Sequence, residues 1–187
     1  MVSLARCSWA STPEYEVYHD TEWGVPLHGD DALFERLALE AFQSGLSWRT
    51  ILYKRPAFRD AFADFAISRV AQFGDDDVAR LMGDVRIVRN RRKIDAVIHN
   101  ARVAVGLPGS LDGLLWSFAP DTPAPRPRSA EDVPAITTES TAMARELKKR
   151  GFVFVGPTTA YALMQATGMV DDHIVGCFRA GAASPAR

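Results

Sequence analysis

Both cysteines and two of the four histidines of this chain could together bind one metal ion. His173 and Cys177 are four residues apart, a spacing that would place both side chains on one face of a helix. Cys7 and His19, near the other end of the chain, could complete a tetrahedral site. A metal held by such distant segments would join the two ends of the chain. The alternative is that the cysteines are inert and the histidines lie on the surface.

One acidic residue and four aromatic residues form the second group that could do chemistry. Tyr15, Tyr18, Trp23 and Trp48 flank Glu40 in the sequence. Aromatic rings together with one carboxylate can form a slot in which a flat, electron-poor ring stacks on both faces. A flipped, positively charged nucleic-acid base would be such a ligand. The alternative is that these aromatic side chains belong to the hydrophobic core.

The densest basic run could bind phosphate groups. It lies at the start of a predicted helix and contains Arg86, Arg89, Arg91, Arg92 and Lys93. Because the N-terminus of a helix attracts anions, we expect Arg86, Arg89 and Lys93 to lie near backbone phosphates. Residues 148–150 form a second possible patch, and either run could instead be a solvated face. The net charge of −1 gives no overall attraction to nucleic acid, so that such binding must come from local clusters.

A helix, a turn and a second helix must position Glu40. Apolar residues at helical spacing predict a helix that starts at Asp30 or Asp31 and runs to Ser44. Gly45 would end it in the left-handed conformation. Leu46 would then lie at a loop tip, and Ser47 would cap a second helix over residues 48–65, with a break at Pro56.

The remaining pattern predicts an all-α protein, because only residues 152–155 alternate like a strand. A short helix follows Thr12 as its cap, and Asp171 or Asp172 would cap the last one. The helix after Thr12 covers residues 14–20. The further helical segments cover residues 68–73, 75–82, 90–105, 111–118, 138–150 and 157–168. We expect one unit, 1–187, with a central part over about 30–118, a Pro-rich loop over 119–134, and a terminal part formed by 1–29 and 135–187.

Composition is that of an ordinary globular protein, with 47% hydrophobic and 24% charged residues. No apolar run approaches the roughly 20 residues that span a membrane, and no signal-peptide core begins the chain. We therefore expect a soluble, cytoplasmic, nucleoid-associated monomer without membrane partners. In such a reducing compartment a disulfide between Cys7 and Cys177 is not expected.

Motifs along nearly the whole chain resemble the bacterial 3-methyladenine DNA glycosylase I family. They include Cys7-Ser8-Trp9, Tyr15, Tyr18-His19-Asp20, Glu22-Trp23-Gly24-Val25-Pro26, Leu39-Glu40, Gln43-Ser44-Gly45-Leu46-Ser47-Trp48, Lys93-Ile94, Asn100-Ala101-Arg102, Trp116-Ser117-Phe118, Lys148-Lys149-Arg150-Gly151-Phe152, Phe154-Val155-Gly156, and Asp172-His173 with Cys177. The resemblance implies a helix-hairpin-helix DNA-repair fold. It also implies hydrolytic removal of N3-methyladenine from double-stranded alkylated DNA, with free 3-methyladenine as product.

The same resemblance implies roles for individual residues. Glu40, the candidate catalytic residue, matches the carboxylate that hydrogen-bonds the methylated base. Tyr18 and Trp48 match the aromatic side chains that stack on it, and Tyr15 and Trp23 fall in the pocket wall. Leu46 matches a loop residue that probes the gap left by the flipped nucleotide.

The resemblance further implies one structural zinc ion, with Cys7, His19, His173 and Cys177 matching the family's ligands. Four protein ligands leave no open position for water, which argues against a zinc hydrolase.

The sequence departs from the family's pattern at Arg86, which stands where the family's hairpin usually has glycine. This difference puts the usual hairpin geometry in doubt.

Neither a catalytic aspartate nor a Schiff-base lysine can be placed in the sequence. We therefore expect a monofunctional hydrolase without strand cleavage. The alternative from another class is a non-enzymatic binder of damaged DNA with the same fold.

Overall fold

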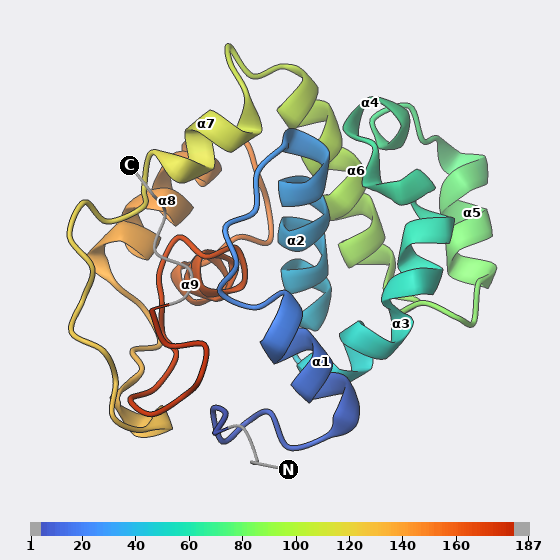
Figure 1. Cartoon of the computed structure of the whole chain (residues 1–187). Helices are drawn as coiled ribbons and strands as arrows, with labels where there is room; N and C mark the ends of the chain where they lie inside the picture. The colour runs from blue at the N-terminus through green and yellow to red at the C-terminus, as the bar shows by residue number, and fades with distance from the viewer. Residues whose placement is uncertain (1–4, 182–187) are drawn as a thin grey trace.

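The computed structural model describes residues 5–181, and this part of the chain is helical, without any strand, as predicted (Figure 1). The predicted unit of 1–187 includes residues 1–4 and 182–187, which lie outside the described range. The α-helices are α1 (Pro13–Thr21), α2 (Asp30–Gln43), α3 (Trp48–Ala61), α4 (Ile67–Val70), α5 (Asp75–Gly83), α6 (Arg91–Val105), α7 (Leu111–Trp116), α8 (Thr138–Lys149) and α9 (Pro157–Ala166). Two 3-10 turns, η1 (Ala63–Phe65) and η2 (Ala130–Asp132), complete the order.

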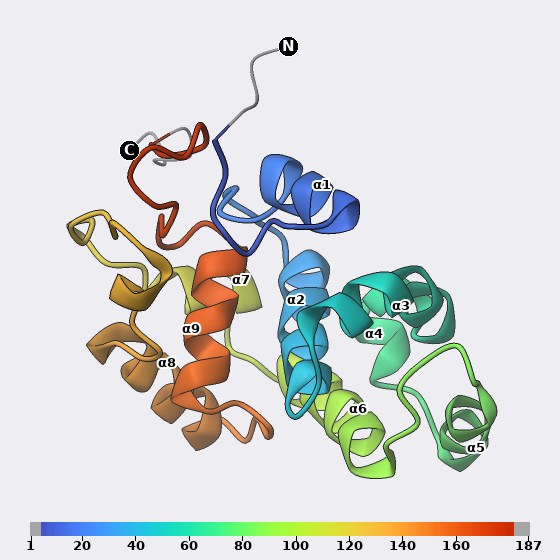
Figure 2. The ribbon, with the colours of Figure 1, turned by 90° about the horizontal axis from the view of Figure 1, so that it is seen from below.

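Helix α2 is the centre of the molecule, and it is buried over all residues from Leu33 to Phe42. It packs against α3, α6, α7 and α9, so that it has no solvated face over this stretch. The α3–α6 helices lie on one side of α2, and α8 and α9 lie on the other (Figures 1 and 2). Charged residues within this stretch, Glu40 among them, are therefore enclosed by the fold.

The turn from α2 to α3 follows the prediction. Gly45 has φ of +80°, a conformation that costs glycine little, and its neighbour Leu46 is 42% exposed. Ser47 then caps α3, because its side chain accepts a hydrogen bond from the Thr50 backbone N–H at 3.3 Å. Contrary to prediction, Pro56 does not break α3, which continues to Ala61.

Helix α2 starts as predicted, but Gly29 is its N-cap rather than either aspartate. The two side chains bind other elements instead. Asp30 accepts a hydrogen bond from the Asp112 backbone N–H in α7 at 2.9 Å, and Asp31 accepts one from the Ile67 backbone N–H at the start of α4 at 2.8 Å. They therefore position neighbouring helices against α2.

The predicted last helix does not form, because residues 171–181 adopt a series of turns. This segment lies beside the N-terminal segment, and the Phe178 backbone N–H donates to the Ala5 carbonyl at 2.9 Å (Figure 2). The two described ends of the chain are therefore in direct contact.

The segment between α5 and α6 forms a tight turn despite Arg86. The φ of Arg86 is not positive, so that glycine is not needed at this position. Asp84 accepts hydrogen bonds from both the backbone N–H and the side chain of Arg86, and Lys54 donates to the Arg86 carbonyl at 2.8 Å. Side chains thus stabilise this turn.

No helix in the described range is long and apolar enough to cross a membrane.

Candidate active site and metal centre

A cavity of about 350 Å³ lies between α1, α2, α9 and the C-terminal segment, and it brings together the predicted acidic and aromatic residues. Its lining includes Tyr15, Tyr18, Trp23, Glu40 and Trp48. Helices α1 and α2, the segment between them and the start of α3 supply these side chains, although they are up to 33 residues apart in the sequence. The predicted slot therefore exists as a cavity rather than as a packed core.

Aromatic rings form most of the cavity wall. The Tyr18 and Trp48 rings lie 5.4 Å apart between centroids, and Trp9 contacts Trp23 at 5.0 Å and Tyr15 at 5.9 Å, both edge to face. The Trp48 indole Nε1 is buried without a hydrogen-bond partner among residues 5–181. The wall can thus stack on a flat ring and still has one free donor.

Glu40 is the acidic group of this cavity, and only 6% of the residue is exposed. No residue in the described range donates a hydrogen bond to its carboxyl group. Burial raises the pKa of Glu40 to about 8, although the positive charge of Arg36 acts in the opposite direction. A buried carboxyl group without a partner is suited to a ligand that brings positive charge and N–H donors.

A network of ion pairs behind the cavity supports these side chains. Glu22 accepts hydrogen bonds from Arg36 at 2.6 Å and from Arg55 at 2.6 and 2.7 Å. Burial opposes the ionisation of Glu22, but these two arginines lower its pKa to about 2. The Arg36 guanidinium also lies 5.7 Å from the Tyr18 ring, so that the network holds α1, α2 and α3 together beside the cavity.

The lining also includes residues to which the sequence gave no role in the cavity, among them Trp9, Gln43 and Asp172. Gln43 lies one turn after Glu40 on α2, and this spacing could have indicated it. Asp172 accepts hydrogen bonds from Tyr161 at 2.6 Å and from Gln165 at 2.7 Å, and these partners from α9 could not be predicted from local sequence.

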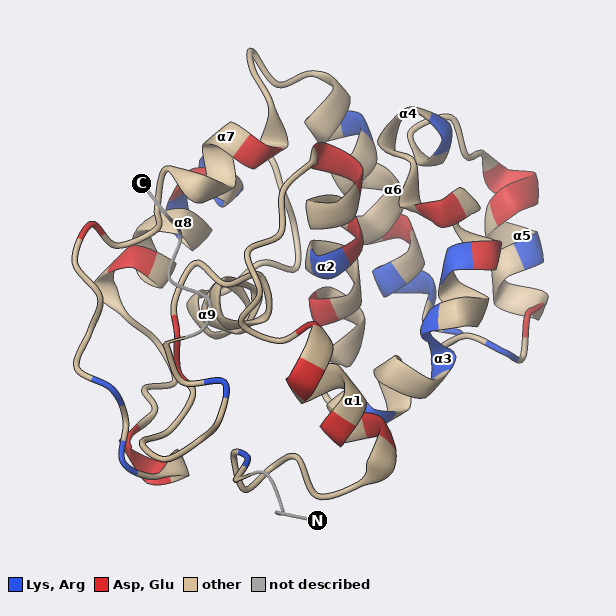
Figure 3. Cartoon of the chain, viewed as in Figure 1, with Lys and Arg blue, Asp and Glu red and all other residues tan. Residues whose placement is uncertain are grey.

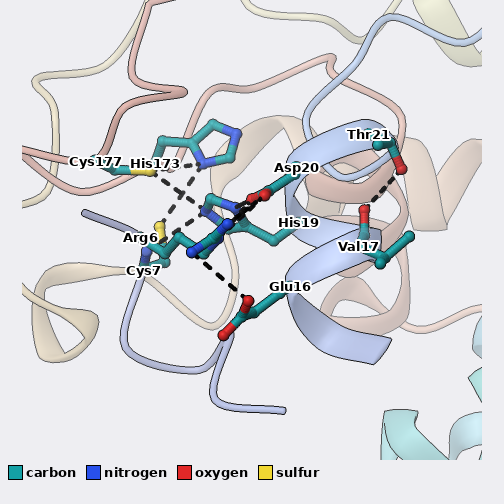
Figure 4. A network of polar contacts seen from close by, with 9 residues as sticks. All are labelled: Arg6, Cys7, Glu16, Val17, His19, Asp20, Thr21, His173 and Cys177. Atoms are coloured by element: carbon teal, nitrogen blue, oxygen red, sulfur yellow. Dashed lines mark hydrogen bonds and ion pairs between the residues drawn. The ribbon is translucent and has the colours of Figure 1, made fainter. Parts of the chain in front are cut away.

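The four predicted metal ligands, Cys7, His19, His173 and Cys177, form one buried cluster (Figure 4). Their candidate ligand atoms all lie within 4.8 Å of one another. Cys177 Sγ is 3.3 Å from His19 Nε2, and both sulfur atoms are 3.7 Å from His173 Nδ1. In a tetrahedral zinc site, sulfur and nitrogen ligands lie about 3.6 Å apart. These three distances are therefore close to those of a tetrahedral zinc site.

The surroundings of the cluster also fit a metal. His19 contacts Asp20 at 2.8 Å through its other ring nitrogen, and Arg6 donates to the same carboxylate at 2.7 Å. Burial lowers the pKa of His173 to about 4, which keeps its ring neutral, as a ligand requires. Burial raises the pKa of the Cys7 thiol to about 11, an effect that a bound cation would reverse.

His173 and Cys177 meet through a turn rather than on a helix face, and this corrects the reason for the predicted pairing. The Cys177 backbone N–H donates to the Ile174 carbonyl at 3.0 Å, which closes the turn. Gly24 allows the cluster to pack closely, because a Cβ atom there would lie 2.9 Å from His173 Nε2.

The predicted DNA-contacting residues have different surroundings. Leu46 and Arg89 are exposed, and Arg89 has no ion-pair partner among residues 5–181. Arg86 is paired with Asp84 and Asp60, each at 2.8 Å. Figure 3 shows Lys and Arg along this turn and at the adjoining parts of α3 and α6.

Lys93 differs from the prediction. It is 7% exposed, and its ammonium group donates to the Phe42 carbonyl at 2.8 Å and to the Ser44 carbonyl. These carbonyls at the end of α2 have no partner within that helix, and they attract a cation. Lys93 therefore joins α6 to the end of α2 and does not extend towards a phosphate.

Comparisons with known proteins agree with this geometry. The family model described as methyladenine glycosylase matches residues 8–180. The DNA-3-methyladenine glycosylase 1 of Escherichia coli K12 is 43% identical over 179 residues, covering 93% of this chain and 96% of the relative. The DNA-3-methyladenine glycosylase of Haemophilus influenzae Rd is 39% identical over 180 residues, covering 92% of this chain and 96% of the relative.

A solved structure is similar over almost the whole fold. It is a tyrosine-to-phenylalanine variant of 3-methyladenine DNA glycosylase I in complex with 3-methyladenine, with a TM-score of 0.89 and 35% identity. The similarity covers 96% of this chain and 99% of the solved chain.

Proposed function

The chain belongs to the methyladenine glycosylase family, and we propose that it removes N3-methyladenine from alkylated DNA by hydrolysis of the glycosidic bond. The observation that carries this proposal is Glu40, a buried carboxyl group without a hydrogen-bond partner in the described range, inside a cavity walled by aromatic rings. The resemblance to a structure that contains 3-methyladenine supports the same assignment.

Recognition in this proposal depends on charge. Methylation at N3 places a positive charge on adenine, so that the extruded base is attracted by aromatic faces and by the Glu40 carboxylate. A cation next to Glu40 favours its ionised form, and the base binds as the carboxyl group gives up its proton. Neutral adenine gains less from both contacts, and the cavity therefore selects the methylated base.

Bond cleavage needs little acid catalysis, because the charged base is already a good leaving group. The base departs with the electron pair of its bond to C1′ and becomes neutral 3-methyladenine. A water molecule forms the new bond to C1′ of the oxocarbenium-like sugar and releases one proton to solvent. No lysine from residues 5–181 lines the cavity, which supports hydrolysis rather than a Schiff-base reaction with strand cleavage.

The Cys7, His19, His173 and Cys177 cluster would hold one zinc ion in this proposal. The ion would join the N-terminal and C-terminal segments and would fix Trp9 and Asp172, next to the ligands, in the cavity wall. Its role would be structural, because four protein ligands close the coordination sphere.

The test is base release from methylated duplex DNA, read by chromatography. Glu40→Gln keeps the shape of the side chain but loses a charge-assisted hydrogen bond, and we expect its rate to fall at least about tenfold. Glu35→Gln, the same change on α2 outside the cavity lining, is the control and should keep the wild-type rate.

Binding of the free bases checks the charge account separately. Glu40→Gln should weaken binding of 3-methyladenine more than binding of adenine, and Glu40→Ala should weaken it further. Equal weakening for both bases would contradict charge recognition. A wild-type protein that binds methylated duplex but releases no base would favour the alternative, a non-enzymatic binder.

A further inference from the structure

The loop between α8 and α9 carries an exposed aromatic side chain in an unfavourable backbone conformation. Phe154 has φ of +57°, in the left-handed region that bulky residues rarely adopt, and it is 38% exposed. Glycine would take this conformation at no cost. A strained, exposed phenylalanine therefore points to a use for its side chain outside the fold.

Contacts with α6 hold the loop in this conformation. Asn100 donates to the Val153 carbonyl at 3.0 Å and accepts a hydrogen bond from the Val153 backbone N–H at 2.9 Å. His99 contacts the Gly151 carbonyl at 2.8 Å. The residue before Phe154 is thus clamped on both of its backbone groups, and the ring of Phe154 is presented by a rigid loop.

Two positively charged side chains lie near this ring. The Arg92 guanidinium is 6.0 Å from the ring centroid. Phe154 also lines a groove on the surface, whose other lining residues include Lys148 and Ser44. Arg92 and Lys148 are exposed, and neither has an ion-pair partner within residues 5–181. An aromatic ring near two such cations is complementary to a nucleic-acid strand, which offers apolar sugar and base surfaces between phosphates.

The groove and the cavity are neighbours at the end of α2. Gln43 lines the cavity, and the next residue, Ser44, lines the groove. Figure 2 shows the α2–α3 loop between the α8–α9 loop and α6. A duplex whose extruded nucleotide entered the cavity would therefore extend over this groove.

We propose that Phe154, Arg92 and Lys148 form a second DNA contact, which holds the duplex beside the extruded nucleotide. Phe154 packs against a neighbouring nucleotide, while Arg92 and Lys148 bind phosphates on either side of it. This inference rests on the proposed function, because it assigns a further surface for the same substrate. The contact is independent of base sequence, as a search for rare lesions along DNA requires.

The test measures affinity for a duplex with one abasic-site analogue as a function of salt. Phe154→Gly removes the ring while glycine accepts the positive φ without strain, and a melting temperature equal to that of wild type shows that the fold is intact. We expect affinity to fall about tenfold with an unchanged salt dependence. Arg92→Ala should reduce the slope of log affinity against log salt by about 1. Val105→Ala, an exposed apolar residue at the other end of α6, should bind as wild type.

Free 3-methyladenine binding distinguishes failure of this inference from failure of the proposed function. If Phe154→Gly and wild type bind the duplex equally, and Arg92→Ala keeps the full salt slope, the second contact is wrong even when base release is normal. If the wild-type protein neither binds the free base nor releases it from DNA, the proposed function fails whatever the duplex affinities are.

Discussion

Glu40 stands in an environment that favours its uncharged form, and this has a measurable energetic cost. Burial raises its pKa to about 8, whereas the ordinary value is 4.5. Between these two pH values the folded protein binds more protons than the unfolded chain, so that stability falls as pH rises. Glu40, for which we propose recognition of the base, is therefore expected to destabilise the free protein at and above neutral pH.

Replacement of Glu40 by Gln removes this cost, and we expect the variant to be more stable than wild type at pH 8. The gain should be roughly 2–4 kcal/mol at pH 8 and should disappear as pH falls to about 4.5, since each pKa unit is worth about 1.4 kcal/mol. Urea unfolding of both proteins at several pH values measures it. A difference that stays constant over the whole range would show that ionisation of Glu40 is not the cause.

At the scale of elements, the turn before α6 carries two arginines with different surroundings. Asp84 and Asp60 already neutralise Arg86, whereas Arg89 is exposed without such a partner in the described range. Only an unpaired cation displaces counterions fully when it meets a phosphate. We therefore propose Arg89 as the main phosphate contact of this turn.

The two arginines serve as matched variants. Arg89→Ala should reduce the salt slope of duplex binding by about 1 and weaken binding to all sequences alike, whereas Arg86→Ala should change the slope less. Affinities measured between low and physiological salt test this difference. Equal effects of the two substitutions would mean that the ion pairs of Arg86 open on binding, and no effect of either would place the turn away from DNA.

At the scale of the whole molecule, the Cys7, His19, His173 and Cys177 cluster brings together segments from the two ends of the described chain. Cys7 and Cys177 are separated by almost the entire chain, yet both sulfur atoms lie 3.7 Å from His173 Nδ1. Because an ordered site does not exist in the unfolded chain, metal binding adds directly to folding stability.

We expect one zinc ion per chain by elemental analysis. Cys177→Ala should lose the ion and lower the melting temperature by about 10 °C, and a chelator should do the same to the wild-type protein. Val175→Ala, an exposed position in the same segment, is the control. An active wild-type protein without zinc, whose melting temperature does not respond to the chelator, would contradict this role.

The sequence by itself determined most of the helices, several of their caps, and the acidic, aromatic and metal-ligand candidates that the fold brings together. Thr12, Ser47 and Asn90 each cap a helix through a hydrogen bond to a backbone N–H three residues later, and such contacts depend only on neighbours in the chain. The motifs around Glu40 likewise indicated the family before any coordinate was known. Signals of this kind are local, and they hold where no distant group competes for the side chain, unlike at Asp30 and Asp31.

Only the tertiary structure decided which partner each long side chain takes. Lys93 and Arg89 belong to one basic run, yet Lys93 binds carbonyls at the end of α2, whereas Arg89 has no ion-pair partner among the described residues. The turn that joins His173 to Cys177 and the strain at Phe154 also depend on atoms from distant segments. The physical reason is range: backbone conformation responds to adjacent residues, whereas the energy of a buried charge depends on whatever the fold brings within a few ångströms of it.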